Sequence, residues 1–183
     1  MSKALYLVRH CQSVGPHPDA PLSREGLVQA NALTDRLTDL QIERIVSSLW
    51  ARAIQSITPL AERLRLAIET DPRLTEQILS GADLPDWQGA LRATFDDLDL
   101  RFEGGESSRT AMQRVVAAVE EIRTHVARVT AVVTHGKLLT LLLKHFDPRV
   151  GFADWQALTN PDIFRLTFAP DRVAVQRVPW RPA

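Results

Sequence analysis

Five side chains that could handle a phosphate group follow the ends of predicted strands. Arg9 and His10 come directly after a short apolar run, Arg52 and Glu76 follow two further strand candidates, and His135 follows a fourth. Arginine presents a planar fork of donors that matches phosphate oxygens. A neutral imidazole can attack phosphorus and form a covalent intermediate. A carboxylic acid can protonate the leaving oxygen and then act as base toward water. The combination suits phosphoryl transfer.

The elements that must position these residues alternate between strand and helix. Apolar runs predict strands, and amphipathic patterns predict helices. The expected strands are residues 3–9, 42–47, 67–70, 129–134, 162–168 and 172–178, the last two joined around Pro170-Asp171, and the expected helices are 23–40, 51–66, a long one from Glu106 or Ser107, and 136–145. This alternation predicts a doubly wound α/β domain, with a mostly parallel central sheet and helices on both faces.

Such a fold would bring the five side chains together. In open α/β sheets, ligands bind beyond the carboxyl ends of the strands, where the strand order changes direction. We therefore expect two Arg, two His and one Glu to converge on one crevice. The helix that begins at Gly136 could add backbone N–H donors at its N-terminus.

Length and composition favour one ordinary globular domain. The 183 residues fit a single domain over 1–183, and 45% of them are hydrophobic. The stretch 77–105 is irregular and rich in glycine, so we expect it to supply loops and a short helix of a substrate region, not a second domain. The last residues, 179–183, have the composition of a loose tail.

Charge and cysteine content exclude several other classes. Lys plus Arg and Asp plus Glu both number 22, and a chain with no basic excess is a poor candidate for binding nucleic acid. No apolar run reaches the ~20 residues of a membrane span, and no leader precedes the first strand. The one cysteine, Cys11, can form no internal disulfide, and no Cys/His spacing resembles a zinc site. We expect a cytoplasmic protein without a metal site or membrane contact.

Several segments resemble, in order and spacing, those of the histidine phosphatase superfamily, also called the phosphoglycerate mutase-like family. Residues 7–13, LVRHCQS, resemble its Arg-His-Gly signature. The other matching segments are residues 21–30, 46–56, 74–76 followed by 87–89, 104–107 and 132–136. The agreement covers roughly residues 4–145, and so much ordered agreement is far more specific than an Arg-His pair alone.

The resemblance implies a role for each residue of the predicted crevice. It makes His10 the nucleophile that becomes a phosphohistidine and Glu76 the proton donor. It also implies that Arg9, Arg52 and His135 hold the phosphate. The implied activity is hydrolysis of small phosphorylated metabolites by a phosphatase that needs no metal and no cofactor.

Two other functions remain open on the same residues. One is a phosphoglycerate mutase, which moves the phosphoryl group between hydroxyls of a bound substrate. The other is a phosphoryl-binding or regulatory module with little turnover. The short chain and the modest insert between Glu76 and His135 favour hydrolysis. The sequence leaves the natural substrate and the oligomeric state open.

Two positions depart from the family pattern. Cys11 stands where the family has a glycine, so we expect either a small apolar filler or, if its pKa is low, an oxidisable thiol. A left-handed backbone there would cost a cysteine about 1–2 kcal/mol. Pro16 stands where many members carry a phosphate-contacting Asn, and Gln12 is a candidate substitute. Glu106 is expected to start a helix or to line the pocket.

Three residues of the irregular stretch are candidates for the substrate region. Trp87 is expected to pack beneath the substrate loop, whereas the other tryptophans, Trp50 among them, are expected to anchor core or surface. Arg92 and Arg101 could bind a second anionic group, although each could equally be a solvated arginine.

Overall fold

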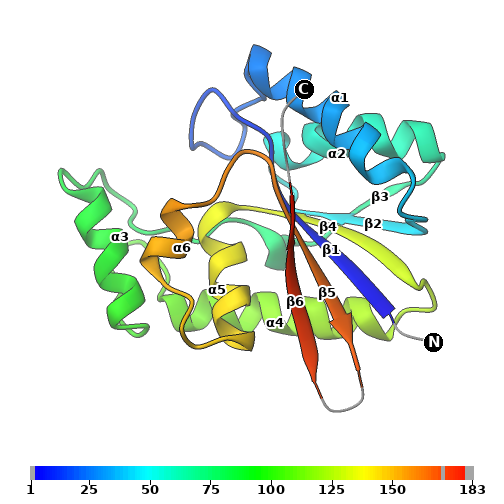
Figure 1. Cartoon of the computed structure of the whole chain (residues 1–183). Helices are drawn as coiled ribbons and strands as arrows, with labels where there is room; N and C mark the ends of the chain where they lie inside the picture. The colour runs from blue at the N-terminus through cyan, green and yellow to red at the C-terminus, as the bar shows by residue number, and fades with distance from the viewer. Residues whose placement is uncertain (1–2, 170–171, 180–183) are drawn as a thin grey trace.

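A six-stranded sheet forms the centre of the computed structural model, which describes residues 3–169 and 172–179 (Figure 1). The strands are β1 (Lys3–Arg9), β2 (Arg44–Ser47), β3 (Ile68–Thr70), β4 (Val129–Thr134), β5 (Asp162–Phe168) and β6 (Val173–Val178). Their order is β3-β2-β4-β1-β5-β6, in which β1 to β4 are parallel and β5 runs antiparallel to both neighbours. The predicted mostly parallel sheet is confirmed. Pro170, Asp171 and the tail beyond Pro179 lie outside the described residues.

Helices cover both faces of the sheet, as a doubly wound fold requires. They are α1 (Arg24–Thr38), α2 (Ala51–Leu64), α3 (Trp87–Asp96), α4 (Ser108–Thr124), α5 (Gly136–Phe146) and α6 (Phe152–Gln156), with a 3₁₀ turn, η1 (Pro72–Leu74). In Figure 1, α1 and α2 lie above the sheet, and α4 and α5 lie below it. The sequence did not indicate α6, because five residues are too few to show a helical period.

The alternation of side chains along β1 divides the core between these two layers. Tyr6 and Val8 belong to the apolar cluster that contains Leu33 of α1 and Leu60 of α2. The intervening Leu5 and Leu7 join the opposite cluster, with residues of α4 and α5. Because both faces of β1 are covered, nearly every residue of the strand is apolar and buried.

Helix α3 is attached beside the sheet and not above either face. Trp87 contacts Trp155 of α6 edge to face, with 6.2 Å between ring centroids. The buried Lys137 of α5 donates to Thr94 Oγ1 at 3.0 Å, and burial lowers the pKa of this lysine to about 7. The irregular stretch thus packs against the same domain that carries the sheet.

The loop after β1 is held against α1 at a glycine. The backbone N–H of Ser23, the N-cap of α1, donates to the Gln12 carbonyl at 3.0 Å. A Cβ added at Gly26 would lie 2.0 Å from that same carbonyl oxygen. Helix α1 can therefore approach the segment after His10 this closely only with glycine at position 26.

We predict that Gly26→Ala destabilises the protein. Helix propensity alone would favour alanine by about 1 kcal/mol. The clash with the Gln12 carbonyl should reverse the sign and lower the free energy of unfolding by about 1–3 kcal/mol. Urea unfolding measures the change, with Gly151→Ala as control, because a Cβ at Gly151 meets nothing within 4 Å. A stabilised Gly26→Ala protein would contradict the close packing.

Candidate active site

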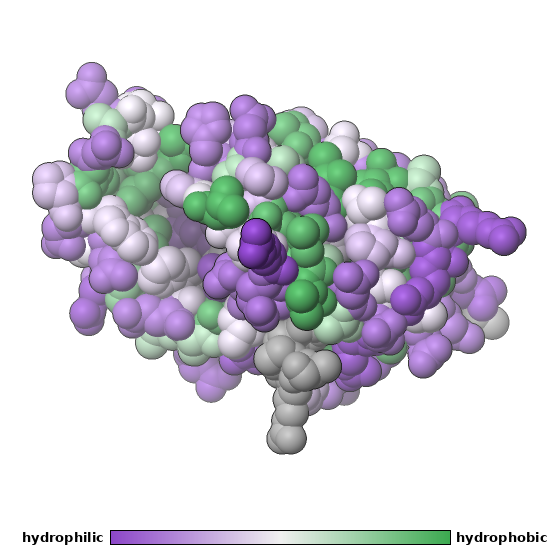
Figure 2. Space-filling model, turned by 90° about the horizontal axis from the view of Figure 1, so that it is seen from above, coloured by the Kyte–Doolittle hydropathy of each residue, from purple (hydrophilic) through white to green (hydrophobic). Residues whose placement is uncertain are grey.

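A cavity of about 880 Å³ opens at the carboxyl ends of the parallel strands. Seen from above in Figure 2, the surface is hollowed beside a group of hydrophobic side chains. The lining residues come from the segments after β1, β2 and β3, from the start of α3 and from the loop before β5; they are Arg9, His10, 12–16, Trp50, Arg52, 76–80, 82–84, Trp87 and Asn160. Four of the five predicted site residues, all but His135, therefore line one cavity.

The register between β1 and β4 places the two histidines together. Arg9 is paired with Thr134, and the His10 backbone N–H donates to the Thr134 carbonyl at 3.0 Å. The next residues, His10 and His135, therefore leave the sheet side by side. Their ring centroids lie 5.1 Å apart.

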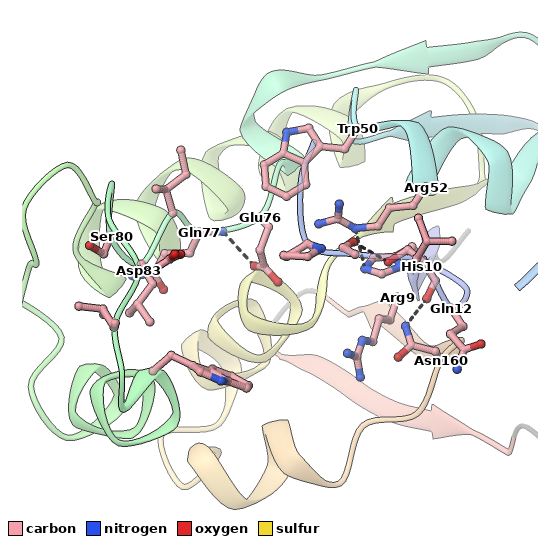
Figure 3. Close-up of a pocket in the computed structure, with 18 of the residues that line it drawn as sticks. Arg9, His10, Gln12, Trp50, Arg52, Glu76, Gln77, Ser80, Asp83 and Asn160 are labelled. Atoms are coloured by element: carbon pink, nitrogen blue, oxygen red, sulfur yellow. Dashed lines mark hydrogen bonds between the residues drawn. The ribbon is translucent and has the colours of Figure 1, made fainter. Parts of the chain in front are cut away.

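His10 is held in one tautomer by a backbone carbonyl. Its Nδ1 lies 2.6 Å from the Cys11 carbonyl oxygen, which can only accept, so Nδ1 carries the proton. The lone pair is then on Nε2, and Arg52 Nε donates to it at 3.2 Å. Asn160 Nδ2 donates to the His10 carbonyl at 2.7 Å and fixes the backbone of the same residue. Figure 3 shows the Arg52 side chain next to the His10 ring.

Burial keeps both imidazoles neutral. The pKa of His10 is lowered to about 3, chiefly by burial and also by the nearby Arg52 and Arg9 cations, whereas the hydrogen bond to the Cys11 carbonyl opposes the shift. The pKa of the fully buried His135 is also well below its usual value, through burial and the neighbouring cations. A neutral His10 with its lone pair on Nε2 is the form that can act as a nucleophile.

Two guanidinium groups reach the site without a carboxylate partner. Arg9 donates to the carbonyls of Leu158 and Thr159, and Arg52 donates to the His17 carbonyl at 2.7 Å. Among the described residues, neither forms an ion pair. Burial lowers the pKa of both arginines. Cations that are removed from water and lack a counter-ion favour binding of an anion.

Two buried nitrogens have no hydrogen-bond partner within the described part of the chain. They are Arg9 Nε and His135 Nδ1. His135 does not line the cavity, because its Nε2 is bonded to Ser48 Oγ at 2.7 Å and Trp50 contacts its ring edge to face at 4.7 Å. A direct bond from His135 to phosphate stays a prediction.

The Glu76 carboxylate lies at the N-terminus of α5 and faces the two arginines. Its Oε1 accepts backbone N–H bonds from Gln77 and Leu138, both at 2.9 Å. Its Oε2 accepts one recorded bond, from Lys137 N at 3.0 Å. Two of the first-turn donors of α5, which we expected to reach phosphate, are thus occupied by this carboxylate, and a bond from the Gly136 N–H to phosphate stays a prediction.

An ion pair outside the cavity positions the segment before Glu76. Arg114 Nη1 donates to the carbonyls of Arg73 and Thr75 at 2.7 and 2.8 Å, and its Nε donates to Glu106 Oε2 at 3.1 Å. Glu106 therefore does not line the pocket, which corrects one of the two alternatives for it. Ser107, not Glu106, caps α4.

Trp50 and Asn160 are site residues that the sequence did not reveal. Trp50 was expected to be a core or surface anchor, but it lines the cavity, and the Arg52 guanidinium stacks over its ring at 4.5 Å. Asn160 follows α6 by only a few residues and acts through the backbone of His10. Trp50 lies within the matching segment 46–56, but its residue type gave no role, and Asn160 lies outside every matching segment.

Cys11 fills space in the core. It is completely buried in the cluster beneath α1 and α2, and burial raises its pKa to about 12. Its backbone N–H donates to Ser56 Oγ at 2.8 Å. Cys11 is not among the described residues with positive φ, so the expected strain is absent there. Of the two alternatives for this residue, the small apolar filler is confirmed.

The remaining predicted residues divide between the cavity and its surroundings. Gln12 and Pro16 line the cavity, but the Gln12 side chain accepts a bond from Ser23 Oγ at 2.7 Å, so its role toward phosphate stays a prediction. Gly136 does not line it; a Cβ there would lie 3.2 Å from the Arg9 guanidinium carbon, so glycine makes room for Arg9.

The structure separates the three candidates for the substrate region. Trp87 lines the cavity and is 49% exposed, so it forms part of the wall instead of packing beneath a loop. Arg92 stacks over Phe152 at 5.6 Å, and neither Arg92 nor Arg101 lines the cavity. The expectation that these arginines bind a second anionic group is not supported by their positions.

Sequence comparison places the chain in a family. Residues 5–181 match the model of the histidine phosphatase superfamily (branch 1), and the chain belongs to this superfamily. An uncharacterised protein of Mycobacterium tuberculosis is 37% identical over 79 residues. That match spans 39% of this chain and 39% of the curated relative.

Solved structures share the fold over nearly the whole chain. A mycobacterial glucosyl-3-phosphoglycerate phosphatase in complex with inorganic phosphate is 27% identical, with a TM-score of 0.78 over 99% of this chain and 97% of that one. A phosphoglycerate mutase from Bacillus anthracis is 18% identical, with a TM-score of 0.77 over 97% of this chain and 92% of that one. The phosphoglycerate mutase-like fold is thereby confirmed.

No group of three or more His, Cys, Asp or Glu side chains in the described part of the chain could hold a metal ion. No helix within it has the length and hydropathy needed to cross a bilayer.

We predict that the buried imidazoles make stability depend on pH. The folded-state pKa of His10, about 3, lies below its ordinary 6.5, so on acidification the unfolded chain takes up the proton first. Through His10 the folded protein should lose about 2 kcal/mol of stability between pH 7.5 and pH 5, and the buried His135 should add a loss of the same sign. Urea unfolding at both pH values should show that His10→Gln removes this part of the loss.

The control is His145→Gln, which removes an imidazole that is exposed to solvent. Equal losses of stability in the wild type and in His10→Gln would contradict a neutral, buried His10.

Proposed function

We propose that this protein hydrolyses phosphate monoesters through a phosphohistidine intermediate on His10. One observation carries the proposal: at one end of a cavity, a neutral imidazole whose Nε2 accepts from Arg52 lies with two guanidinium groups that form no ion pair among the described residues. Arg9 and Arg52 would neutralise the equatorial oxygens of the phosphoryl group. Membership in the histidine phosphatase superfamily supports the same chemistry.

The reaction has two steps, and the residues present account for every bond and proton in both. His10 Nε2 bonds to phosphorus as the ester P–O bond breaks, and Glu76 gives a proton to the leaving oxygen. Water then attacks phosphorus, the N–P bond breaks, and Glu76 takes up the proton. Its Oε2 is the atom suited to carry that proton, because Oε1 already accepts two backbone bonds and Oε2 accepts one. The two guanidinium groups supply the positive charge, so we propose that the reaction needs no metal ion.

Loss of the nucleophile should abolish turnover. We predict that His10→Ala lowers kcat/KM for p-nitrophenyl phosphate by about 10³-fold or more, whereas the exposed His145→Ala leaves it unchanged. EDTA should not reduce phosphate release by the wild type, and rapid quenching should trap a phosphorylated protein that His10→Ala does not form. Activity that EDTA abolishes, or that survives in His10→Ala, would contradict the proposal. Conversion of 3-phosphoglycerate to its isomer would identify a mutase instead.

Replacement of the acid should depend on the leaving group. We predict that Glu76→Gln lowers kcat by about 10²-fold for an alkyl phosphate, whose oxygen needs a proton to leave. The loss should be much smaller for p-nitrophenyl phosphate, whose phenolate leaves without one. Steady-state kinetics on both substrates measure the two losses, with Glu103→Gln as an isosteric control outside the cavity. Equal losses on the two substrates would show that Glu76 is not the acid.

A further inference from the structure

The cavity has two chemically different ends. Arg9, His10 and Arg52 lie together at one end, and Ser80 and Asp83 lie on the opposite side, beyond Glu76 (Figure 3). The lining residues with apolar side chains other than the phosphate-end Trp50 are Val14, Pro16, Ile78, Leu79, Ala82, Leu84 and Trp87. Three of these are strongly exposed: Val14 is 66%, Ile78 52% and Trp87 49% accessible. Large apolar side chains left open to water around a cavity favour an apolar ligand.

The described residues at the end distant from His10 include no lining cation. Among the described residues that line the cavity, the only Lys or Arg side chains are Arg9 and Arg52, both at the phosphate end. Asp83 contributes an exposed carboxylate at the other end. A second anionic group on a substrate would therefore meet apolar side chains and a carboxylate, with no counter-ion among the described lining residues.

This wall differs from what a phosphoglycerate requires. Any phosphoglycerate carries a carboxylate in addition to its phosphate, and a carboxylate removed from water needs a cation or several donors. The two arginines of the irregular stretch could have supplied one, but Arg92 stacks over Phe152 and Arg101 lies outside the lining. The described lining of this wall thus supplies no counter-ion for the carboxylate of a phosphoglycerate.

We propose that the cavity selects phosphate monoesters whose leaving alcohol is apolar and carries no negative charge. Asp83 further favours a cationic substituent over an anionic one. This inference rests on the proposed hydrolase function, since it identifies the phosphate end by Arg9, His10 and Arg52. The cavity volume of about 880 Å³ accommodates a leaving group as large as an aromatic ring or a longer alkyl chain beside the phosphate.

Binding of phosphonates tests the selectivity without turnover. Calorimetry would compare methylphosphonate, benzylphosphonate, 4-carboxybenzylphosphonate and 4-(aminomethyl)benzylphosphonate on the wild-type protein. We expect benzylphosphonate to bind about 10-fold or more tightly than methylphosphonate, because the ring is buried against the apolar wall. The aminomethyl compound should bind about 10-fold more tightly than the carboxy compound at low salt, and the ratio should shrink as salt screens Asp83.

Substitutions at the wall assign the effect to its residues. Asp83→Asn should reduce the ratio of the two charged ligands toward one, and Asp83→Lys should reverse it. Asp96→Asn removes the same charge from the exposed end of α3, outside the cavity lining, and should leave the ratio unchanged. Ile78→Ser should weaken benzylphosphonate several-fold and leave methylphosphonate unaffected.

The outcomes separate this inference from the hydrolase proposal. Equal or tighter binding of the carboxy compound by the wild type would overturn the selectivity, even if the protein hydrolyses p-nitrophenyl phosphate. So would an unchanged ratio in Asp83→Lys. If the phosphonates bind in the expected order but the protein hydrolyses no phosphate monoester, the selectivity is supported and only the hydrolase proposal is contradicted.

Discussion

The parallel pairing of β1 with β4 is the interaction on which the site depends. It aligns Arg9 with Thr134, so that the chain leaves both strands at the same level and His10 and His135 emerge side by side. The same edge receives Ser48, whose backbone N–H donates to the Val133 carbonyl, and Leu74, whose carbonyl accepts from Thr134 Oγ1. A one-residue shift of this ladder would turn the side chains of β1 to the opposite faces and break up both halves of the core.

The charged side chains of the site are bonded to backbone groups and not to one another. Arg9 and Arg52 are held by backbone carbonyls, while the carboxylate nearest to them, Glu76, is held by backbone N–H groups of α5. Each of these three charged groups thus has hydrogen-bond partners on the backbone, and none forms an ion pair among the described residues. The resulting positive field adds to burial in keeping His10 neutral, and it favours an oxyanion at the site. Arrangements of this kind reduce stability locally and are found where ligands bind.

Most of the fold could be predicted from the sequence because its elements have strong local periods. The strand 129–134 agrees with β4 at both ends, and the helix from Gly136 begins where it was expected. Helix α6 and the position of α3 could not be predicted, since both depend on contacts such as Trp87 with Trp155 and Lys137 with Thr94. Arg92 illustrates the limit: its residue type suggested an anion contact, but packing against Phe152 decided its position.

The sequence by itself determined the fold class, the superfamily and the inventory of phosphate-handling side chains, because strand ends and motif residues are local features of the chain. Only the tertiary structure decided how those side chains are used. The bond to the Cys11 carbonyl leaves the imidazole lone pair of His10 on Nε2, and the Trp50 ring packs against His135. The tertiary structure also placed Asp83, and no third cation among the described lining residues, across from the two arginines. Tautomer, burial and the charge of a wall arise from distances between segments far apart in the chain, and no local pattern encodes them.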